Sequence, residues 1–154
     1  MKKADQAERV GRRLRRDREE ILCRTGEAVW TPIFGENESS EVFCEGIIHT
    51  VAPYNTDHDR DSLLEGCYYN SISLASAMAS QRSPRIVTPL LGTGVKNINL
   101  ALSTEALLKA VLRLSEHQPR QCYVEVVLQP TPETDMEIEA VRQRLGRFIN
   151  NIDV

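Results

Sequence analysis

The stretch from Ile86 to Val95 holds the residues whose types and spacing are best suited to chemistry. It is a short apolar run that leads into the loop Gly92-Thr93-Gly94. Glycines allow close approach of a ligand to the backbone and permit positive φ, and consecutive exposed N–H groups in such a loop attract anions. Ligands of open α/β sheets gather at the carboxyl ends of the strands, so this loop is a candidate anion site. A simple tight turn is the competing interpretation, since short Gly-x-Gly turns are common.

Other chemistry-bearing residues form no recognisable site. The chain has four cysteines, and none lies in a Cys-x-x-Cys pair or at metal-ligand spacing from a histidine. We therefore expect no metal, no cofactor and buried, reduced thiols, as in a cytosolic or nuclear protein. The cysteines are Cys23, Cys44, Cys67 and Cys122.

Two histidine-containing segments have a chemical and a structural interpretation. Asp57-His58-Asp59 contains possible metal ligands, but adjacent side chains rarely converge on one ion, so acidic capping of the next helix is favoured. His49 is a conceivable general base, yet it lies within an apolar strand, which favours a packed core histidine. Serine, histidine and aspartate show no recognisable triad spacing, so these residue types identify no catalytic residue.

Length and composition indicate one globular domain. The 154 residues are enough for a sizeable core, and the hydrophobic fraction of 41% and charged fraction of 27% are ordinary for a globular protein. The net charge of -3 argues against a polyanion binder held by bulk electrostatics. No apolar run approaches the roughly 20 residues that span a bilayer, and no apolar stretch follows the charged N-terminus, so we expect neither a membrane protein nor a secreted one.

Hydrophobic periodicity predicts the elements that position the loop. Strands are expected at Glu27–Thr31, within Val42–Val51 and at Arg85–Leu90, and the last is Cys122–Leu128. Helices are expected at Ala4–Leu22, from a Ser62–Glu65 capping box to Ala79, over Leu100–Glu116 and from Thr131 onward. The inward residues predicted for the third helix are Leu107, Leu108, Val111 and Leu112.

The alternation of strands and helices in the second half implies parallel strands with helices on both faces. Cys122–Leu128 is nearly continuous in apolar residues, as expected of a strand covered on both faces. We therefore predict a three-layer α/β/α fold in which Ile86–Leu90 and Val124–Leu128 are adjacent and parallel. Residues 1–24 would form a basic N-terminal helix and residues 25–154 the core of the single domain.

The first predicted helix carries an arginine-rich face. Its charge could serve a phosphate or nucleic-acid contact, but interleaved acidic residues offset much of it and favour a solvated face. The arginines are Arg9, Arg12, Arg13, Arg15, Arg16 and Arg18.

Four segments, in the right order and at the right separation, resemble the macro domain family, which binds ADP-ribose. They are the segments Thr25–Pro32, Ile47–Pro53, Leu64–Ala75 and Pro89–Val95. The resemblance implies a macro-domain-like α/β/α fold with a mixed sheet. It also implies that the loop after Pro89 wraps a diphosphate and its distal ribose.

The chain also departs from the family pattern. The strands that usually precede the first helix, the Asn-Ala-Ala-Asn loop and the glycine run have no counterpart, and Lys96 stands where an aromatic residue is common. The resemblance assigns part of ribose binding and the hydrolase residues to those segments. If a central strand is missing, its neighbours should pair with each other or with another chain, because buried unpaired backbone groups are costly.

Three functions follow, in order of preference. The first is an ADP-ribose-binding module that engages ADP-ribose or an ADP-ribosylated protein, with Thr93 adding a hydroxyl and Lys96 a point charge. The second is an assembly or RNA-binding module that acts through an open sheet edge, with RNA not favoured, and the third is an ADP-ribosyl hydrolase. The ligand-binding residues predicted for the first are Leu91, Gly92, Thr93, Gly94, Val95, Lys96 and Asn97.

Overall fold

The protein is represented by a computed structural model that describes residues 23–33, 44–80, 83–117 and 122–128, together with Glu139 and Gln143. β2 lies inside the predicted region 42–51, and the other described elements begin and end within two residues of the predicted bounds. The predicted helices over 4–22 and from Thr131 onward lie outside the continuous described segments. In chain order, the elements are β1 (Ala28–Pro32), β2 (Gly46–Thr50), α2 (Arg60–Met78), β3 (Arg85–Pro89), α3 (Leu100–His117) and β4 (Tyr123–Val127).

The strands of the described residues form two separate pairs. β1 and β2 are antiparallel, with Trp30 opposite Ile48. β3 and β4 are parallel, with Ile86 opposite Val124, so the predicted parallel pair is confirmed. The fold therefore contains both strand orientations, as the mixed-sheet prediction required, but β2 and β3 do not pair with each other.

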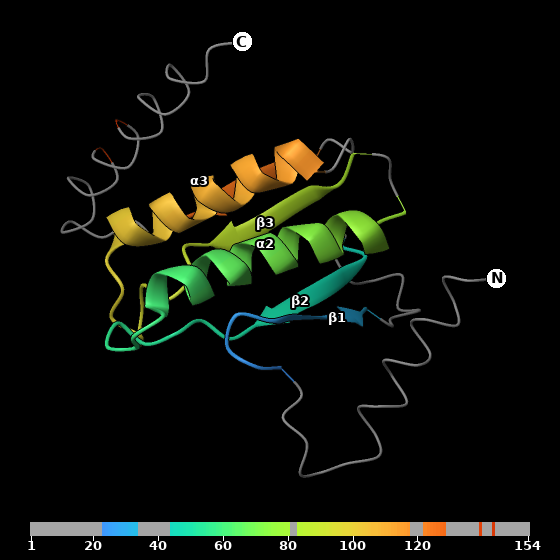
Figure 1. The fold of residues 1–154 in the computed structure, drawn as a ribbon. Coiled ribbons are helices and arrows are strands. Elements are labelled where there is room, and N and C mark those ends of the chain that lie inside the picture. The colour runs from blue at the N-terminus through green and yellow to red at the C-terminus, as the bar shows by residue number, and fades with distance from the viewer. Residues whose placement is uncertain are drawn as a thin grey trace, which may run out of the picture.

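Helices α2 and α3 pack against each other and cover one side of both strand pairs (Figure 1). α2 contacts β1 and β2, while the inward side chains of β3 and β4, including Ile86 and Val124, pack against the core between the two helices. Burial of these apolar surfaces is the main favourable term that holds such layers together. The buried cluster consists of Leu64, Tyr68, Ile72, Ile98, Ala106, Leu107, Ala110 and Leu114.

The predicted capping box at the start of α2 is wrong. The N-cap position is Asp59, whose side chain makes no capping hydrogen bond, and the helix already begins at Arg60. The preceding turn explains the earlier start. The Asp57 carboxylate accepts the N–H of Tyr54, and the Asp57 carbonyl accepts the N–H of Arg60. The Asp57 side chain thus caps the turn before α2 and not the helix itself.

The predicted inward face of α3 is partly wrong. Leu107 is buried as expected, but Val111 is 38% exposed. The buried positions recur at spacings of three and four, and they include two small polar residues that hydropathy alone passes over. They are Ser103, Thr104, Ala106, Leu107, Ala110 and Leu114.

Among the described residues, β4 packs against the core through one face only. Along β4 exposure alternates, so that Val124 and Val126 are partly buried while Tyr123 and Val127 are 67% and 51% exposed. β3 alternates in the same way, with Val87 58% exposed. The continuous apolar sequence of β4 therefore produces an exposed apolar face opposite the helices.

Candidate functional site

The candidate site is the loop between β3 and α3, and its bends need special backbone geometry. Gly92 has φ +78° and Asn97 has φ 58°, both in the left-handed region. Asparagine tolerates this region better than most residues, and glycine adopts it without steric cost. The two residues lie near the two ends of the predicted binding segment, so they set where the chain turns out of β3 and back toward α3.

Internal hydrogen bonds hold this loop in one shape. The N–H of Asn97 donates to the Gly94 carbonyl at 2.9 Å, and the N–H of Ile98 donates to the Gly92 carbonyl at 3.0 Å. The Thr93 hydroxyl donates to the Leu90 carbonyl at 2.9 Å. Its one proton is therefore already committed, so the predicted donation from Thr93 Oγ1 to a ligand does not fit this arrangement.

The outer part of the loop keeps its backbone donors free. Within the part of the chain that the structure describes, the N–H groups of Gly94, Val95 and Lys96 make no hydrogen bond. The Val95 residue is 94% exposed, so these donors lie at the surface of the loop. Successive free backbone N–H groups in a turn attract anions through their dipoles.

The two glycines of the loop have different physical roles. A Cβ built on Gly92 would lie 2.6 Å from Ile98 Cδ1, and that residue also has a positive φ. A Cβ built on Gly94 would meet nothing within 4 Å, and its φ is not in the left-handed region. Of the two glycines, Gly92 therefore supplies the left-handed φ of the loop, and Gly94 does not.

Lys96 connects the loop to the chain that follows β2. Its ammonium lies 3.4 Å from the centre of the Tyr54 ring, in a cation–π contact. The Lys96 carbonyl also accepts the N–H of Asn55 at 2.9 Å. The predicted point charge thus stands on the edge of the loop, where Tyr54 holds it in place.

Leu91 is fixed at both of its backbone polar groups. Its N–H donates to the Tyr68 hydroxyl at 2.7 Å, and its carbonyl accepts the Ser103 hydroxyl at 2.8 Å. Tyr68 and Ser103 come from α2 and α3, and their oxygens are 2.7 Å apart. Sequence reasoning did not find this contact, because nothing in the sequence signals that Tyr68 and Ser103 meet across 35 residues.

His49 is not the core histidine that we predicted. Burial alternates along β2, and His49 is one of the exposed positions. The described residues show no hydrogen bond from its side chain to residues 91–97. The described contacts therefore do not link the His49 imidazole to the loop, where a general base would have to act.

The cysteines are free, but only one is buried. Cys67 is buried, Cys23 and Cys122 are partly buried, and Cys44 is exposed, so the prediction of four buried thiols is wrong. Burial raises the pKa of the Cys67 thiol, which keeps it protonated at neutral pH. No group of three metal-ligating side chains occurs among the described residues.

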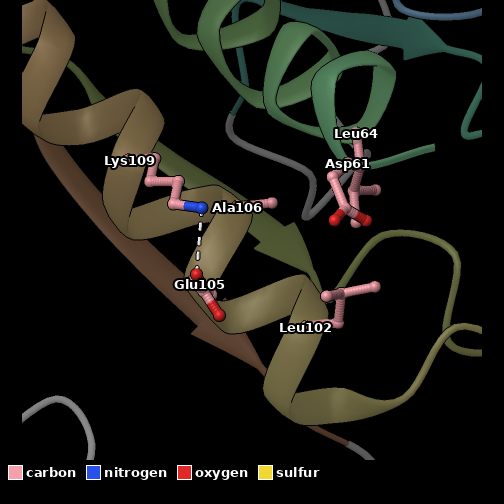
Figure 2. Close-up of a pocket in the computed structure, with 6 residues that line it drawn as sticks. All are labelled: Asp61, Leu64, Leu102, Glu105, Ala106 and Lys109. Atoms are coloured by element: carbon pink, nitrogen blue, oxygen red, sulfur yellow. Dashed lines mark ion pairs between the residues drawn. The ribbon is translucent and has the colours of Figure 1, made fainter. Parts of the chain in front are cut away.

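A small pocket of about 100 Å³ lies between the N-terminal halves of α2 and α3 (Figure 2). Its main charged groups are Asp61 on α2 and Glu105 on α3, and Glu105 forms an ion pair with Lys109 at 2.9 Å. No residue of the 91–97 loop lines it, so this pocket is separate from the candidate site. The lining residues are Asp61, Leu64, Leu102, Glu105, Ala106 and Lys109.

The described helices contain no segment that is both long and apolar enough to cross a membrane.

Comparison with solved structures shows what the fold resembles. The Oceanobacillus iheyensis macrodomain is similar with a TM-score of 0.66 and 21% identity, over 84% of this chain and 60% of that chain. A structure of that macrodomain with ADP gives a TM-score of 0.64 and 22% identity, over 84% and 62% of the two chains. The macro domain of ganglioside induced differentiation associated protein 2 gives 0.57 and 27%, over 80% and 56%.

Sequence comparison points to the same family. The non-structural polyprotein p200 of Rubella virus (strain RA27/3 vaccine) is 38% identical over 93 residues, which are 57% of this chain and 4% of the polyprotein. This chain therefore spans only a small part of that relative, and less than two thirds of the macrodomain structures above. Residues 4–107 match the family model described as Macro domain. This match covers well over half of the sequence, and the chain therefore belongs to the macro domain family.

Proposed function

We propose that this protein is an ADP-ribose-binding module in which residues 91–97 receive the diphosphate. The observation that carries the proposal is the row of N–H groups at Gly94, Val95 and Lys96 that have no hydrogen bond among the described residues, on a loop that internal bonds of Thr93, Asn97 and Ile98 hold in shape. The family binds ADP-ribose, and the similar Oceanobacillus iheyensis macrodomain has been solved with ADP. Fixed backbone donors suit a diphosphate because they are oriented before the ligand arrives.

The electrostatics of the loop favour the same ligand class. Backbone N–H dipoles supply partial positive charge that no side-chain change removes. Lys96 adds a full charge at the edge of the loop, held by Tyr54. The open space around Gly94 leaves room for a phosphate to approach the backbone closely.

The proposed partners are free ADP-ribose and proteins modified with it. We also propose that the protein works inside the cell, in cytoplasm or nucleus. The support for the compartment is the set of free thiols at Cys23, Cys44, Cys67 and Cys122, which suits reducing surroundings.

Calorimetric titration with ADP-ribose tests the binding proposal, and Gly94→Val is the sharpest variant. A Cβ at Gly94 meets no protein atom, so the variant should fold with normal stability. The added isopropyl group would nevertheless occupy the space where the ligand approaches. We expect a loss of roughly 1–3 kcal/mol in binding, the scale of hydrogen bonds that are left unmade.

Val95→Ala is the matched control for this experiment. It shortens a side chain that is 94% exposed and keeps every N–H of the loop, so binding should stay within about twofold of wild type, the scale of surface changes. Equal binding by wild type and Gly94→Val would place the ligand elsewhere, and no heat of binding in wild type would remove the proposal.

We propose further that the module does not hydrolyse ADP-ribosyl bonds. The support is His49, the histidine considered above as a general base, which is exposed on the outward side of β2. Release of ADP-ribose from a modified protein substrate, followed by mass spectrometry, tests this. A rate equal to that of a hydrolytic macro domain assayed beside it would contradict the proposal.

A role in assembly is the second candidate, and one observation favours it. Val87, Tyr123 and Val127 are all more than half exposed on the outer face of β3 and β4. The pair β1-β2 and the pair β3-β4 also do not hydrogen-bond to each other, and no other described strand pairs with the edges of either. Exposed apolar residues beside open strand edges are typical of protein–protein contacts.

A further inference from the structure

The buried polar contacts around Leu91 form a closed ring. Leu91 N–H donates to Tyr68 Oη at 2.7 Å, and Ser103 Oγ donates to the Leu91 carbonyl at 2.8 Å. The Tyr68 and Ser103 oxygens lie 2.7 Å apart. These contacts join the first residue of the candidate loop to both helices that cover the strands.

The proton count of this ring gives each bond one direction. A serine hydroxyl has one proton, and Ser103 uses it on the Leu91 carbonyl, which has none to give. The bond between the two hydroxyls must therefore be donated by Tyr68 to Ser103. Leu91 N–H then donates to Tyr68, Tyr68 to Ser103, and Ser103 back to Leu91, so that every donor has an acceptor.

The surroundings of the ring make each of its bonds matter. Tyr68 is 1% exposed and Ser103 is 0% exposed, so water cannot replace a lost partner without a change in packing. Burial also raises the pKa of the Tyr68 hydroxyl, although the Leu91 N–H that donates to it works against this shift. The hydroxyl thus stays protonated at neutral pH and remains a donor.

The ring determines how the loop leaves β3. With both polar groups of Leu91 fixed, the next residue, Gly92, turns at φ +78° and presents its carbonyl to Ile98. That turn directs the following N–H groups, from Gly94 to Lys96, away from the core. The loop is therefore held from its inner end, by residues that do not belong to it.

We propose that Tyr68 and Ser103 are positioning residues that preorganise the loop for its anionic ligand through Leu91, an inference that rests on the proposed ADP-ribose binding. Neither side chain reaches the surface, so neither touches the ligand. Their contribution is to reduce the freedom that the loop must lose on binding. A loop that is ordered in advance binds more tightly than one ordered by the ligand.

Hydrogen exchange on the ligand-free protein tests the positioning directly. Tyr68→Phe keeps the aromatic side chain in the core but leaves the Leu91 N–H without its acceptor. Hydrogen exchange at the Leu91 amide should therefore accelerate about tenfold or more, the scale of one lost buried hydrogen bond. Tyr69→Phe is the matched control. It removes a hydroxyl from the next residue, whose ring faces Arg113 rather than the loop. Amides in the middle of α3 should exchange equally in both variants.

A double-mutant cycle, measured as the affinity for ADP-ribose, tests the same contacts in ligand binding. We expect Tyr68→Phe and Ser103→Ala each to weaken binding about tenfold, and the double variant to bind within about twofold of either, because one broken bond already opens the ring. Tyr69→Phe should bind as wild type does. Effects that multiply in the double variant would overturn the inference.

The two measurements separate this inference from the proposed function. If wild type binds no ADP-ribose, the proposed ligand is wrong, and exchange at Leu91 still decides whether Tyr68 and Ser103 hold the loop. If Tyr68→Phe does not fold, Ser103→Ala carries both measurements. Unchanged exchange from Leu91 to Lys96 in the folded variants would overturn the positioning role, whatever the ligand.

Discussion

Gly92→Ala should destabilise the fold, because this change meets two obstacles at once. The first is conformational: Gly92 has φ +78°, and an L-residue with a side chain pays roughly 1–2 kcal/mol in the left-handed region. The second is steric: the new Cβ would lie 2.6 Å from Ile98 Cδ1. Ile98 is 2% exposed, so its side chain has little room to move, and overpacking of this kind costs about 1–3 kcal/mol.

The net effect is smaller than these terms together. Alanine restricts the unfolded chain more than glycine does, which returns up to ~1 kcal/mol. We therefore expect Gly92→Ala to lower the free energy of unfolding by about 1–4 kcal/mol, as judged from these contributions. Urea denaturation followed by circular dichroism measures this difference.

Gly94→Ala is the control, since its Cβ meets nothing within 4 Å and needs no unusual φ. Its stability should lie within about 0.5 kcal/mol of wild type. The atom responsible can also be identified. Ile98→Val removes the δ-methyl that the new Cβ of Gly92→Ala would strike. The loss of unfolding free energy caused by Ile98→Val should therefore be smaller in the Gly92→Ala variant than in wild type. A Gly92→Ala variant as stable as Gly94→Ala would refute the reasoning.

Three further predictions follow from other contacts. Lys96→Ala should weaken ADP-ribose binding by about 1 kcal/mol or less, and the difference should shrink with added salt, because an exposed charge is screened; equal affinity losses at low and high salt in calorimetry would contradict this. Sedimentation at micromolar concentration should show self-association, because the outer face of β3 and β4 exposes Val87, Tyr123 and Val127; a strict monomer would argue against the assembly role. Burial raises the pKa of Tyr68, so the unfolded chain loses this proton first and the free energy of unfolding should fall as pH rises past about 10; Tyr68→Phe should show a shallower alkaline decline in urea denaturation.

The elements were predictable from sequence because each rests on local periodicity. Short apolar runs over residues 85–90 and 122–128 indicate strands by their length and composition, and both segments pair in parallel as expected. Capping was less predictable. Ser62 and Glu65 have the spacing of a capping box, but the helix start depends on Asp57, which closes a turn before it. Such a competition between two local hydrogen-bonding options is decided by the whole turn and not by one motif.

The candidate site was predictable in position but not in its internal structure. A Gly-x-Gly after an apolar strand locates the loop at the carboxyl end of β3. It does not show that Thr93 donates to Leu90, that Lys96 lies over Tyr54, or that Tyr68 and Ser103 hold Leu91. These contacts join residues whose partners are set by packing, and packing has no signature in the spacing of a single sequence.

Gly92 and Gly94 show why the same residue type can be required for different reasons. Gly92 turns the chain beside Ile98 and is needed by the folded protein even without a ligand. Gly94 faces open space, so the fold alone gives no reason for a glycine there. If a diphosphate fills that space, stability measurements should single out Gly92, while binding measurements on stable variants should single out Gly94. A loss of stability in Gly94→Ala together with unchanged ADP-ribose affinity would contradict this division of roles.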